Sequence, residues 1–271
     1  MCSFGEVLKE FVDSYPAAAT TTSDRVSLPP TNAEPVTRPV MVQRWTDVVF
    51  LHWRFERDVV QALLPEGVTV DTYDGSAWVG LVPFQMERLG LPGLAPLPHV
   101  GRFPEVNVRT YVRAGDRRGV WFFSLDIDRL LPAAVARAAY HLPYCSGRAG
   151  HLRAGDLVMS RVERRWPSRD DRVTSEIVVR TGNPLAQDDH LARFLTARWG
   201  LVSATRRGRL RYASVDHPAW PLHAGEVVHL EDSLLDAAGL PVPSERAHVM
   251  WSPGVDVRVG APRRIHQRAT A

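Results

Sequence analysis

Lysine is almost absent from this sequence, although arginine is abundant. Lys9 is the one lysine among 33 basic residues, and it precedes the segment that we expect to fold. Because arginine stays protonated and does not form a Schiff base in the ordinary way, covalent catalysis through a side-chain amine is nearly excluded there. A GC-rich genome would also produce this bias, and the chemical consequence is the same under either explanation.

Cysteines and long apolar runs are scarce as well. The two cysteines, Cys2 and Cys145, are too few for a disulfide framework or a cysteine-based zinc site. No stretch of about 18 apolar residues occurs, so we expect no membrane span. Residues 1–19 lack the basic region and long apolar run of a signal peptide, and the sequence therefore predicts a cytoplasmic protein.

Several common catalytic and nucleotide-binding motifs are missing. The sequence has no GxGxxG, Walker A, HExxH or GxSxG pattern, which argues against dinucleotide, NTP, zinc-protease and α/β-hydrolase chemistry. The net charge of +3 comes without a long basic run, so we expect no nucleic-acid partner. The histidines show no metal-ligand spacing with a carboxylate, and we predict no metal and no other cofactor.

Composition divides the chain into three parts. Residues 1–38 combine a short amphipathic segment with a stretch rich in Thr, Ser, Pro and Ala, which predicts a flexible tail or linker. Residues 39–262 carry the strand-like patterns, and residues 263–271 form a short C-terminal tail. The length is sufficient for one large core, and the oligomeric state stays open, a homo-oligomer included.

Short strands dominate the predicted domain. Strand patterns cover residues 45–55, 68–73, 77–87, 105–113 and 119–126, hairpin-like pairs at 147–163, 172–181 and 201–215, and last strands at 225–229 and 256–259. Helical patterns cover residues 57–64, 130–139, 190–199 and 233–238. Asp74-Gly75 predicts a tight hairpin turn. These patterns predict a mainly β fold with flanking helices (α+β), built on a closed or strongly curved sheet.

Eight segments are distinctive when they are read in order. They are Phe50-Leu51-His52-Trp53, Leu64-Pro65-Glu66-Gly67, residues 74–84, residues 105–112, residues 122–126, Leu142-Pro143-Tyr144, residues 194–199 and His217-Pro218-Ala219-Trp220. Together they resemble the YqjF-like family, a bacterial domain of unknown function that looks like a distant branch of the acetoacetate decarboxylase superfamily. The resemblance covers about residues 41–259. It implies an acetoacetate-decarboxylase-like closed, cone-shaped β-barrel with an internal pocket.

The same resemblance argues against the decarboxylase's own chemistry. The decarboxylase carries a Tyr-Pro-Lys-Lys segment whose first lysine forms the Schiff base. The matching segment here is Leu142-Pro143-Tyr144-Cys145, so Tyr144 and Cys145 stand where the two lysines would be. We therefore do not expect Schiff-base decarboxylation, and whether the protein is an enzyme stays open.

One pocket residue carries over from the resemblance, the decarboxylase's glutamate, which matches Glu105. In a strand, Glu105, Asn107 and Arg109 share one face because side chains alternate. This face either lines the interior and serves a ligand, or is solvated while the intervening residues point inward. Because buried polar groups are costly unless they pair or bind a ligand, the sequence alone slightly favours the solvated position. The resemblance favours the interior position.

The predicted site assigns a role to each candidate. Glu105 would transfer a proton, while Arg109 and the Tyr144 phenol would hold a developing oxyanion. The catalytic candidates are Glu105 and Tyr144, and the substrate-binding candidates are Arg109, Asn107, His52 and Arg137. In the alternatives, Tyr144 is an ordinary half-buried tyrosine, His52 is a core histidine and Arg137 forms a structural ion pair.

Four further residues are weaker candidates. The decarboxylase's pocket arginine falls near Thr46, and Arg44 lies two residues earlier on the same strand face, so its role is open. Arg198 is expected in a structural ion pair with a carboxylate such as Asp126 or Glu105. His217 and Trp220 would close one end of the barrel.

The leading hypothesis is a small-molecule pocket protein for an organic acid or a carbonyl or enol metabolite. As an enzyme it would be a lysine-independent lyase, hydratase or isomerase. The alternatives are a non-catalytic ligand-binding barrel and a structural or interaction protein. Several convergent titratable groups in a pocket would favour an enzyme, a single arginine anchor would favour a binding protein, and a filled interior would favour a structural role.

Overall fold

The computed structural model describes residues 35–95, 101–129, 137–167, 172–186 and 188–265, and strands dominate this part of the chain. The strands are β1 (Met41–Phe55), β2 (Thr69–Val70), β3 (Ala77–Gly90), β4 (Phe103–Ala114), β5 (Arg117–Ile127), β6 (Tyr144–Ala154), β7 (Leu157–Trp166), β8 (Thr174–Pro184), β9 (Gly200–Ala204), β10 (Leu210–Asp216), β11 (His223–Asp232), β12 (His248–Val259) and β13 (Arg263–Arg264). The helices are α2 (Arg57–Gln61), α4 (His190–Thr196) and α5 (Leu234–Ala237). The prediction of a mainly β fold with few helices is confirmed. Of the helix predicted at 130–139, residues 137–139 are helical and the rest lies outside the described residues.

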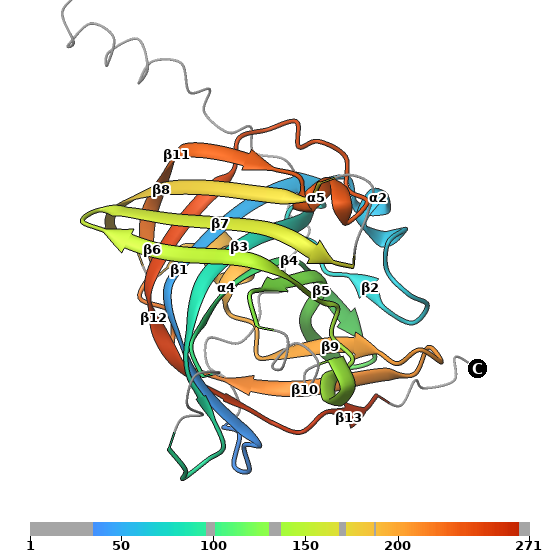
Figure 1. Ribbon diagram of the computed structural model, residues 1–271. Coiled ribbons are helices and arrows are strands. Elements are labelled where there is room, and N and C mark those ends of the chain that lie inside the picture. The colour runs from blue at the N-terminus through green and yellow to red at the C-terminus, as the bar shows by residue number, and fades with distance from the viewer. Residues whose placement is uncertain (1–34, 96–100, 130–136, 168–171, 187, 266–271) are drawn as a thin grey trace, which may run out of the picture.

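These strands form one sheet in the order β13-β10-β9-β5-β6-β7-β8-β11-β12-β1-β3-β4-β2, with β4–β5 and β10–β12 as additional pairings. Most neighbours are antiparallel, and β5 runs parallel to both β6 and β9. In Figure 1, β6, β7, β8 and β11 form a group apart from the β9–β10 hairpin, and β1, β3 and β4 run between the two groups. The additional pairings therefore fold the sheet back onto itself.

The strand β4 is buried on both faces as a result. Val106 and Val108 pack into the main apolar core, which includes residues of β7 and β8. Glu105 and Asn107 point to the opposite face, yet each is only 3% exposed. Arg109 follows them on the same face and lines a cavity there. The alternative in which this polar face is solvated is therefore wrong, because a second interior lies on that side of the strand.

A bulge in β1 sets which of its side chains face this second interior. Asp47 adopts a positive φ of 49°, and the β1–β3 register shifts in this region. Trp45 before the bulge and Val48 after it both line the interior, although strict alternation would place them on opposite faces. Pro83 of β3 lies opposite the shifted stretch, where the missing N–H of proline is tolerated.

The turn at Asp74-Gly75 forms as predicted, with φ values of 50° and 74° and a bridge between Tyr73 and Ser76. The strand predicted at 68–73 shortens to β2, which pairs with β4 rather than with β3. The backbone N–H of the next residue, Asp71, still donates to the carbonyl oxygen of Tyr111 in β4 at 2.8 Å, and the Asp71 side chain binds arginines.

Gly80 of β3 provides the space that the His52 imidazole occupies. A Cβ at Gly80 would lie 2.6 Å from Nε2 of His52, whose side chain is fully buried. We expect Gly80→Ala to lower the free energy of unfolding by about 1–3 kcal/mol, as overpacking of a filled core does. Urea denaturation measures this change. Gly150→Ala is the matched strand control, since a Cβ there meets nothing within 4 Å; equal losses in both variants would contradict the packing argument.

Candidate functional site

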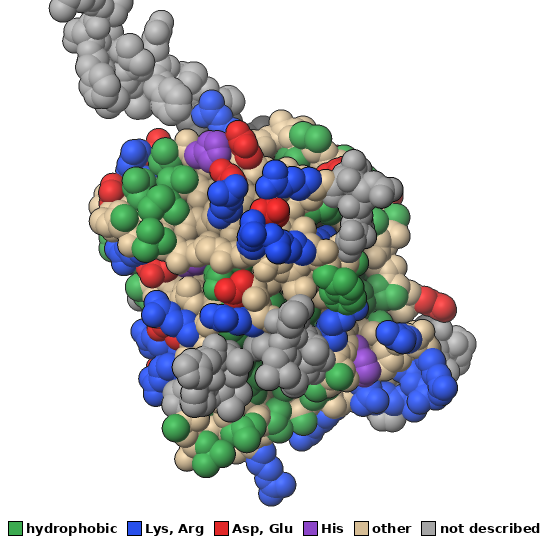
Figure 2. Space-filling model, in the orientation of Figure 1, with side chains coloured by type: hydrophobic (Ala, Val, Ile, Leu, Met, Phe, Trp, Pro, Cys, Tyr) green, Lys and Arg blue, Asp and Glu red, His purple; other side chains and the backbone are tan. Residues whose placement is uncertain are grey.

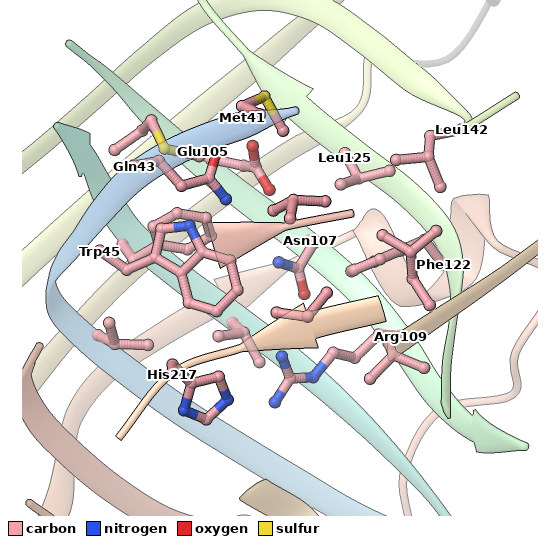
Figure 3. Close-up of a pocket in the computed structure, with 18 of the residues that line it drawn as sticks. Met41, Gln43, Trp45, Glu105, Asn107, Arg109, Phe122, Leu125, Leu142 and His217 are labelled. Atoms are coloured by element: carbon pink, nitrogen blue, oxygen red, sulfur yellow. The ribbon is translucent and has the colours of Figure 1, made fainter. Parts of the chain in front are cut away.

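A cavity of about 430 Å³ lies on the second interior face, bounded by β1, β3, β4, β5 and the β9–β10 hairpin (Figure 3). Its volume is within the range of small-molecule sites. Most of the wall is apolar or aromatic and includes Trp45, Phe50, Phe84, Phe103, Phe122, Leu125, Leu142 and Trp220. The interior is therefore not filled, whereas a filled interior would have favoured a structural role.

Polar side chains interrupt this apolar wall, and they are Gln43, Glu105, Asn107, Arg109, Tyr144, Thr196, Arg198 and His217. The structure thus brings four of the six predicted site residues to one cavity. The other two, His52 and Arg137, are not among its lining residues. Several titratable groups converge here, which is the pattern that the sequence analysis associated with an enzyme.

Glu105, Asn107 and Tyr144 form one hydrogen-bonded cluster. The Tyr144 hydroxyl donates to Oε2 of Glu105 at 3.3 Å, and the Asn107 side chain also hydrogen-bonds to Glu105. Burial raises the pKa of Glu105 to about 7. The nearby Asp126 also raises this pKa, whereas the hydrogen bonds from Asn107 and Tyr144 lower it. Burial and the neighbouring Glu105 raise the pKa of Tyr144 well above its ordinary value, so the phenol keeps its proton.

The parallel pairing of β5 with β6 places Tyr144 beside this glutamate. Tyr144 pairs with Leu125 of β5, and Glu105 of the adjacent β4 pairs with Ile127 of the same strand. The Oδ1 atom of Asn107 is buried and has no hydrogen-bond partner among the described residues. A buried acceptor of this kind is costly unless a ligand donates to it.

Arg109 lies at the other end of the polar row. Figure 3 shows its guanidinium beside His217 and below Asn107, away from Glu105. It donates to the Tyr111 hydroxyl at 3.5 Å and lies 5.5 Å from the Phe50 ring centroid. Within the described part of the chain no carboxylate pairs with Arg109. Its charge is therefore free for an anionic ligand group.

His217 provides a neutral acceptor near Arg109. Its Nδ1 lies 2.7 Å from the carbonyl oxygen of Pro218, so Nδ1–H donates and Nε2 carries the lone pair. Burial lowers the pKa of His217 to about 4, which keeps the ring neutral near pH 7. Its ring packs against Trp199 at 4.6 Å and Trp220 at 5.1 Å. His217 and Trp220 line the cavity, and Trp199 packs behind His217.

Arg198 lines the cavity but is held by an ion pair, as expected, with a different partner from those considered. Its Nη1 lies 2.7 Å from Asp71, whose carboxylate also binds Arg113 at 2.8 Å. Asp126, one of the expected partners, instead forms a bidentate pair with Arg164 at 2.7 Å for each bond. Both buried carboxylates are thus structural.

His52 and Arg137 lie behind the cavity wall. The Nε2 atom of His52 is 2.6 Å from the Tyr111 hydroxyl, and burial lowers the pKa of this histidine well below its ordinary value. Arg137 donates to the backbone carbonyl of Tyr144 and lies 4.4 Å from the Trp166 ring centroid. The predicted direct contact of either side chain with a ligand in this cavity is not what the structure shows.

Arg44 also points away from the cavity and pairs with the exposed Asp256 at 3.3 Å. The Asp47 bulge explains this orientation, since it brings Gln43 and Trp45 rather than Arg44 to the interior. Sequence reasoning did not single out Gln43, because a positive φ at an aspartate leaves no clear pattern in one sequence.

The described residues contain no lysine nucleophile, no metal-binding cluster and no membrane-spanning helix. Among them no lysine occurs, since the single Lys9 lies outside the described residues, and so none of them can form a Schiff base. No group of three or more His, Cys, Asp or Glu side chains in this part of the chain is arranged to hold a metal ion. No helix within it is long and apolar enough to cross a membrane.

Comparisons with known proteins agree on one family and one fold. The model of the DUF2071 family, an uncharacterized conserved protein, matches residues 42–256. YqjF of Bacillus subtilis (strain 168), an uncharacterized protein, is 32% identical over 218 residues, which are 80% of this chain and 89% of that protein.

Two solved structures show the fold. Acetoacetate decarboxylase from Legionella pneumophila subsp. pneumophila str. Philadelphia 1 has a TM-score of 0.62 at 14% identity and covers 92% of this chain and 98% of its own. The enduracididine biosynthesis enzyme MppR, solved in complex with pyruvate, has a TM-score of 0.57 at 15% identity and covers 91% of this chain and 98% of its own. These identities are low, and the likeness therefore shows a shared fold.

Proposed function

This chain belongs to the DUF2071 family, and we propose that it binds an organic acid or a carbonyl or enol compound in its apolar cavity. The observation that carries the proposal is the buried Glu105 carboxyl, which has a pKa of about 7 and a proton-donating Tyr144 beside it. The unpaired Arg109 supplies the anchor for an acidic group. MppR, a protein with this fold, was solved with pyruvate, which is an acid of this kind.

We further propose that the protein is a lysine-independent lyase, hydratase or isomerase. Near neutral pH a carboxyl with a pKa of about 7 is present in both forms, so Glu105 can take up and return a proton. As a base, Glu105 would remove a proton from carbon next to a carbonyl, and the electron pair would move to the carbonyl oxygen. Tyr144 would donate its hydrogen bond to that oxygen as negative charge develops.

The roles of Arg109 and Tyr144 are separate in this proposal. Tyr144 contacts Glu105, whereas Arg109, four residues further along the strand from Glu105, contacts Tyr111. Residues four apart in a strand are separated by roughly 13 Å at their Cα atoms. Arg109 is therefore assigned to an anionic group distant from the reacting carbon, and Tyr144 alone to the oxyanion.

The expected closed barrel is part of the same proposal. Successive pairings connect β1, β3, β4, β5, β9, β10 and β12, and β12 pairs again with β1. We assign the cone-shaped barrel to this ring of strands and the domain to residues 39–262. The cavity would then be its interior, which explains why a ligand there would be shielded from water.

The first test is a thermal-shift screen of the purified chain against keto acids, enols and related metabolites. A ligand at about 100-fold above its Kd stabilises the native state by roughly 2.7 kcal/mol. We expect an acid or carbonyl compound to raise the Tm of the wild type. Arg109→Ala should weaken that ligand by about 10- to 100-fold, since a charged hydrogen bond contributes roughly 1.5–3 kcal/mol.

Arg44→Ala is the matched control, because Arg44 lies on the same sheet but faces outward and pairs with the exposed Asp256. This variant should bind the ligand like the wild type. A panel that shifts nothing, or a ligand that binds Arg109→Ala as tightly as Arg44→Ala, would contradict the proposal.

A further inference from the structure

A second hollow lies on the surface beside the β9–β10 turn and has a volume of about 1070 Å³. Five arginines line it, namely Arg137, Arg206, Arg207, Arg209 and Arg211. No aspartate or glutamate is among the described residues that line it. We call this hollow the arginine groove. It shares one lining residue, Leu142, with the apolar cavity and is otherwise a separate site.

None of these five arginines forms an ion pair within the described ranges. Elsewhere in the fold arginines are widely paired, and Asp71 alone binds Arg113, Arg118 and Arg198. Like charges that share a small surface repel one another unless a counter-ion is present. The five arginines therefore give the groove a concentrated positive charge that no carboxylate of the described residues neutralises.

Arg211 gives the groove an unsatisfied donor. Its side chain is half-buried, and Nε is shielded from water with no hydrogen-bond partner among the described residues. A buried N–H without an acceptor costs about 1–3 kcal/mol. An anion in the groove would supply that acceptor. The unsatisfied Nε of Arg211 is therefore an argument for a ligand that is separate from the positive charge of the groove.

The alternation of β10 explains how the groove and the cavity come to lie on one face of the hairpin. Arg211 and Val215 lie on the same face of β10, because four residues separate them, and Val215 lines the apolar cavity. Arg209 lies in the turn just before the strand. The face therefore changes from apolar to cationic toward the turn. Figure 2 shows basic side chains gathered at this end of the molecule, over the β9–β10 hairpin of Figure 1.

We propose that the arginine groove binds a small molecule that carries two or more phosphate groups. Guanidinium groups bind phosphate oxygens in bidentate geometry, and several converging arginines suit several phosphates. The hydroxyls of Ser146 and Thr205 add neutral donors, while Pro143 and Trp166 give the groove apolar walls. A concave site with such walls fits a small ligand, whereas nucleic acid calls for an extended basic stripe.

Isothermal titration calorimetry tests this proposal with two probes, ATP and inorganic tripolyphosphate. The test variant is Arg209→Ala/Arg211→Ala, and the control is Arg161→Ala/Arg258→Ala, which removes the same charge from exposed positions on β7 and β12. We expect the wild type to bind ATP, the test variant to bind about tenfold more weakly or worse, and the control to stay within about twofold.

The two probes separate the two sources of phosphate. Tighter binding of ATP would identify a phosphorylated organic molecule, and equal binding would identify the phosphates alone as the ligand. If neither probe binds at about 1 mM, or if the test variant binds ATP as the control does, the proposal is overturned. A short single-stranded oligonucleotide that binds more tightly than ATP and depends on the same arginines would overturn it in favour of nucleic acid. Arg209→Gln/Arg211→Gln replaces the alanine variant if that does not fold.

Discussion

Replacing Glu105 with Gln should reduce turnover of any substrate that the cavity accepts by roughly 10²- to 10⁴-fold, the usual contribution of a general acid or base. Ligand binding should survive, because the Gln side chain keeps the shape and can still accept the hydrogen bond from Tyr144. The measurement is kcat beside the ligand-induced thermal shift. If Glu105→Gln turns over substrate like the wild type, the enzyme proposal is wrong. If the wild type binds the ligand but does not turn it over, the protein is a binding protein instead.

The same variant has a second signature that needs no substrate. The pKa of Glu105 is 4.5 in the unfolded chain and about 7 in the folded one. A raised acid pKa contributes stability that is present below the unfolded value and is lost as pH rises through the folded value. The wild type should therefore lose about 3 kcal/mol relative to Glu105→Gln between pH 4 and pH 8.

Urea denaturation across this pH range measures the difference between the two proteins. Glu66→Gln is the control, because that side chain is exposed and the substitution leaves the cavity unchanged. Parallel pH profiles for the wild type and Glu105→Gln would show that the carboxyl titrates normally, and the acid/base role would lose its physical basis.

Asp71→Asn should cost about 3–5 kcal/mol of stability at neutral pH, the usual loss when one partner of a buried ion pair is removed. Asp71 is 2% exposed and binds Arg198 and Arg113. Burial alone would raise its pKa, but these arginines and Arg118 lower it below the ordinary value, so the stabilisation is present at neutral pH and lost on acidification. Asparagine keeps the shape and leaves the buried Arg198 without its anion.

Denaturation at neutral pH tests this, with Asp116→Asn as the control. Asp116 is exposed and contacts the exposed Arg117 at 3.6 Å. Exposed pairs contribute about 0–1 kcal/mol, so this control should change little. A loss at Asp71 that does not exceed the loss at Asp116 would show that the arginine cluster is satisfied without its carboxylate.

Much of the fold was predictable because its signals are local. Period-two alternation located the strands, and Asp74-Gly75 located a tight turn. The ordered motifs identified the YqjF-like family, which the comparisons confirm. The polar row Glu105, Asn107 and Arg109 was found for the same reason, since a strand repeats every two residues and the sequence displays that spacing directly.

The remainder depended on contacts between distant parts of the chain. The positive φ of Asp47 reverses the alternation of β1, so Gln43 was overlooked, while the role of Arg44 was left open. His52 looked suited to a ligand, yet its partner Tyr111 lies 59 positions away. The sequence around Asp71 gives no sign that Arg198, 127 positions later, pairs with it. Such partners come together only in the folded protein.

The double burial of β4 divides its residues by parity into two sets with different tasks. Val106 and Val108 fill a core that has no room to vary, since every volume change there meets the packed side chains of β7 and β8. Glu105 and Asn107 border empty space, where a different side chain alters the cavity without disturbing that core. We therefore expect substitutions at Glu105 and Asn107 to change the shape and polarity of the cavity, and substitutions at Val106 and Val108 to change the stability of the core.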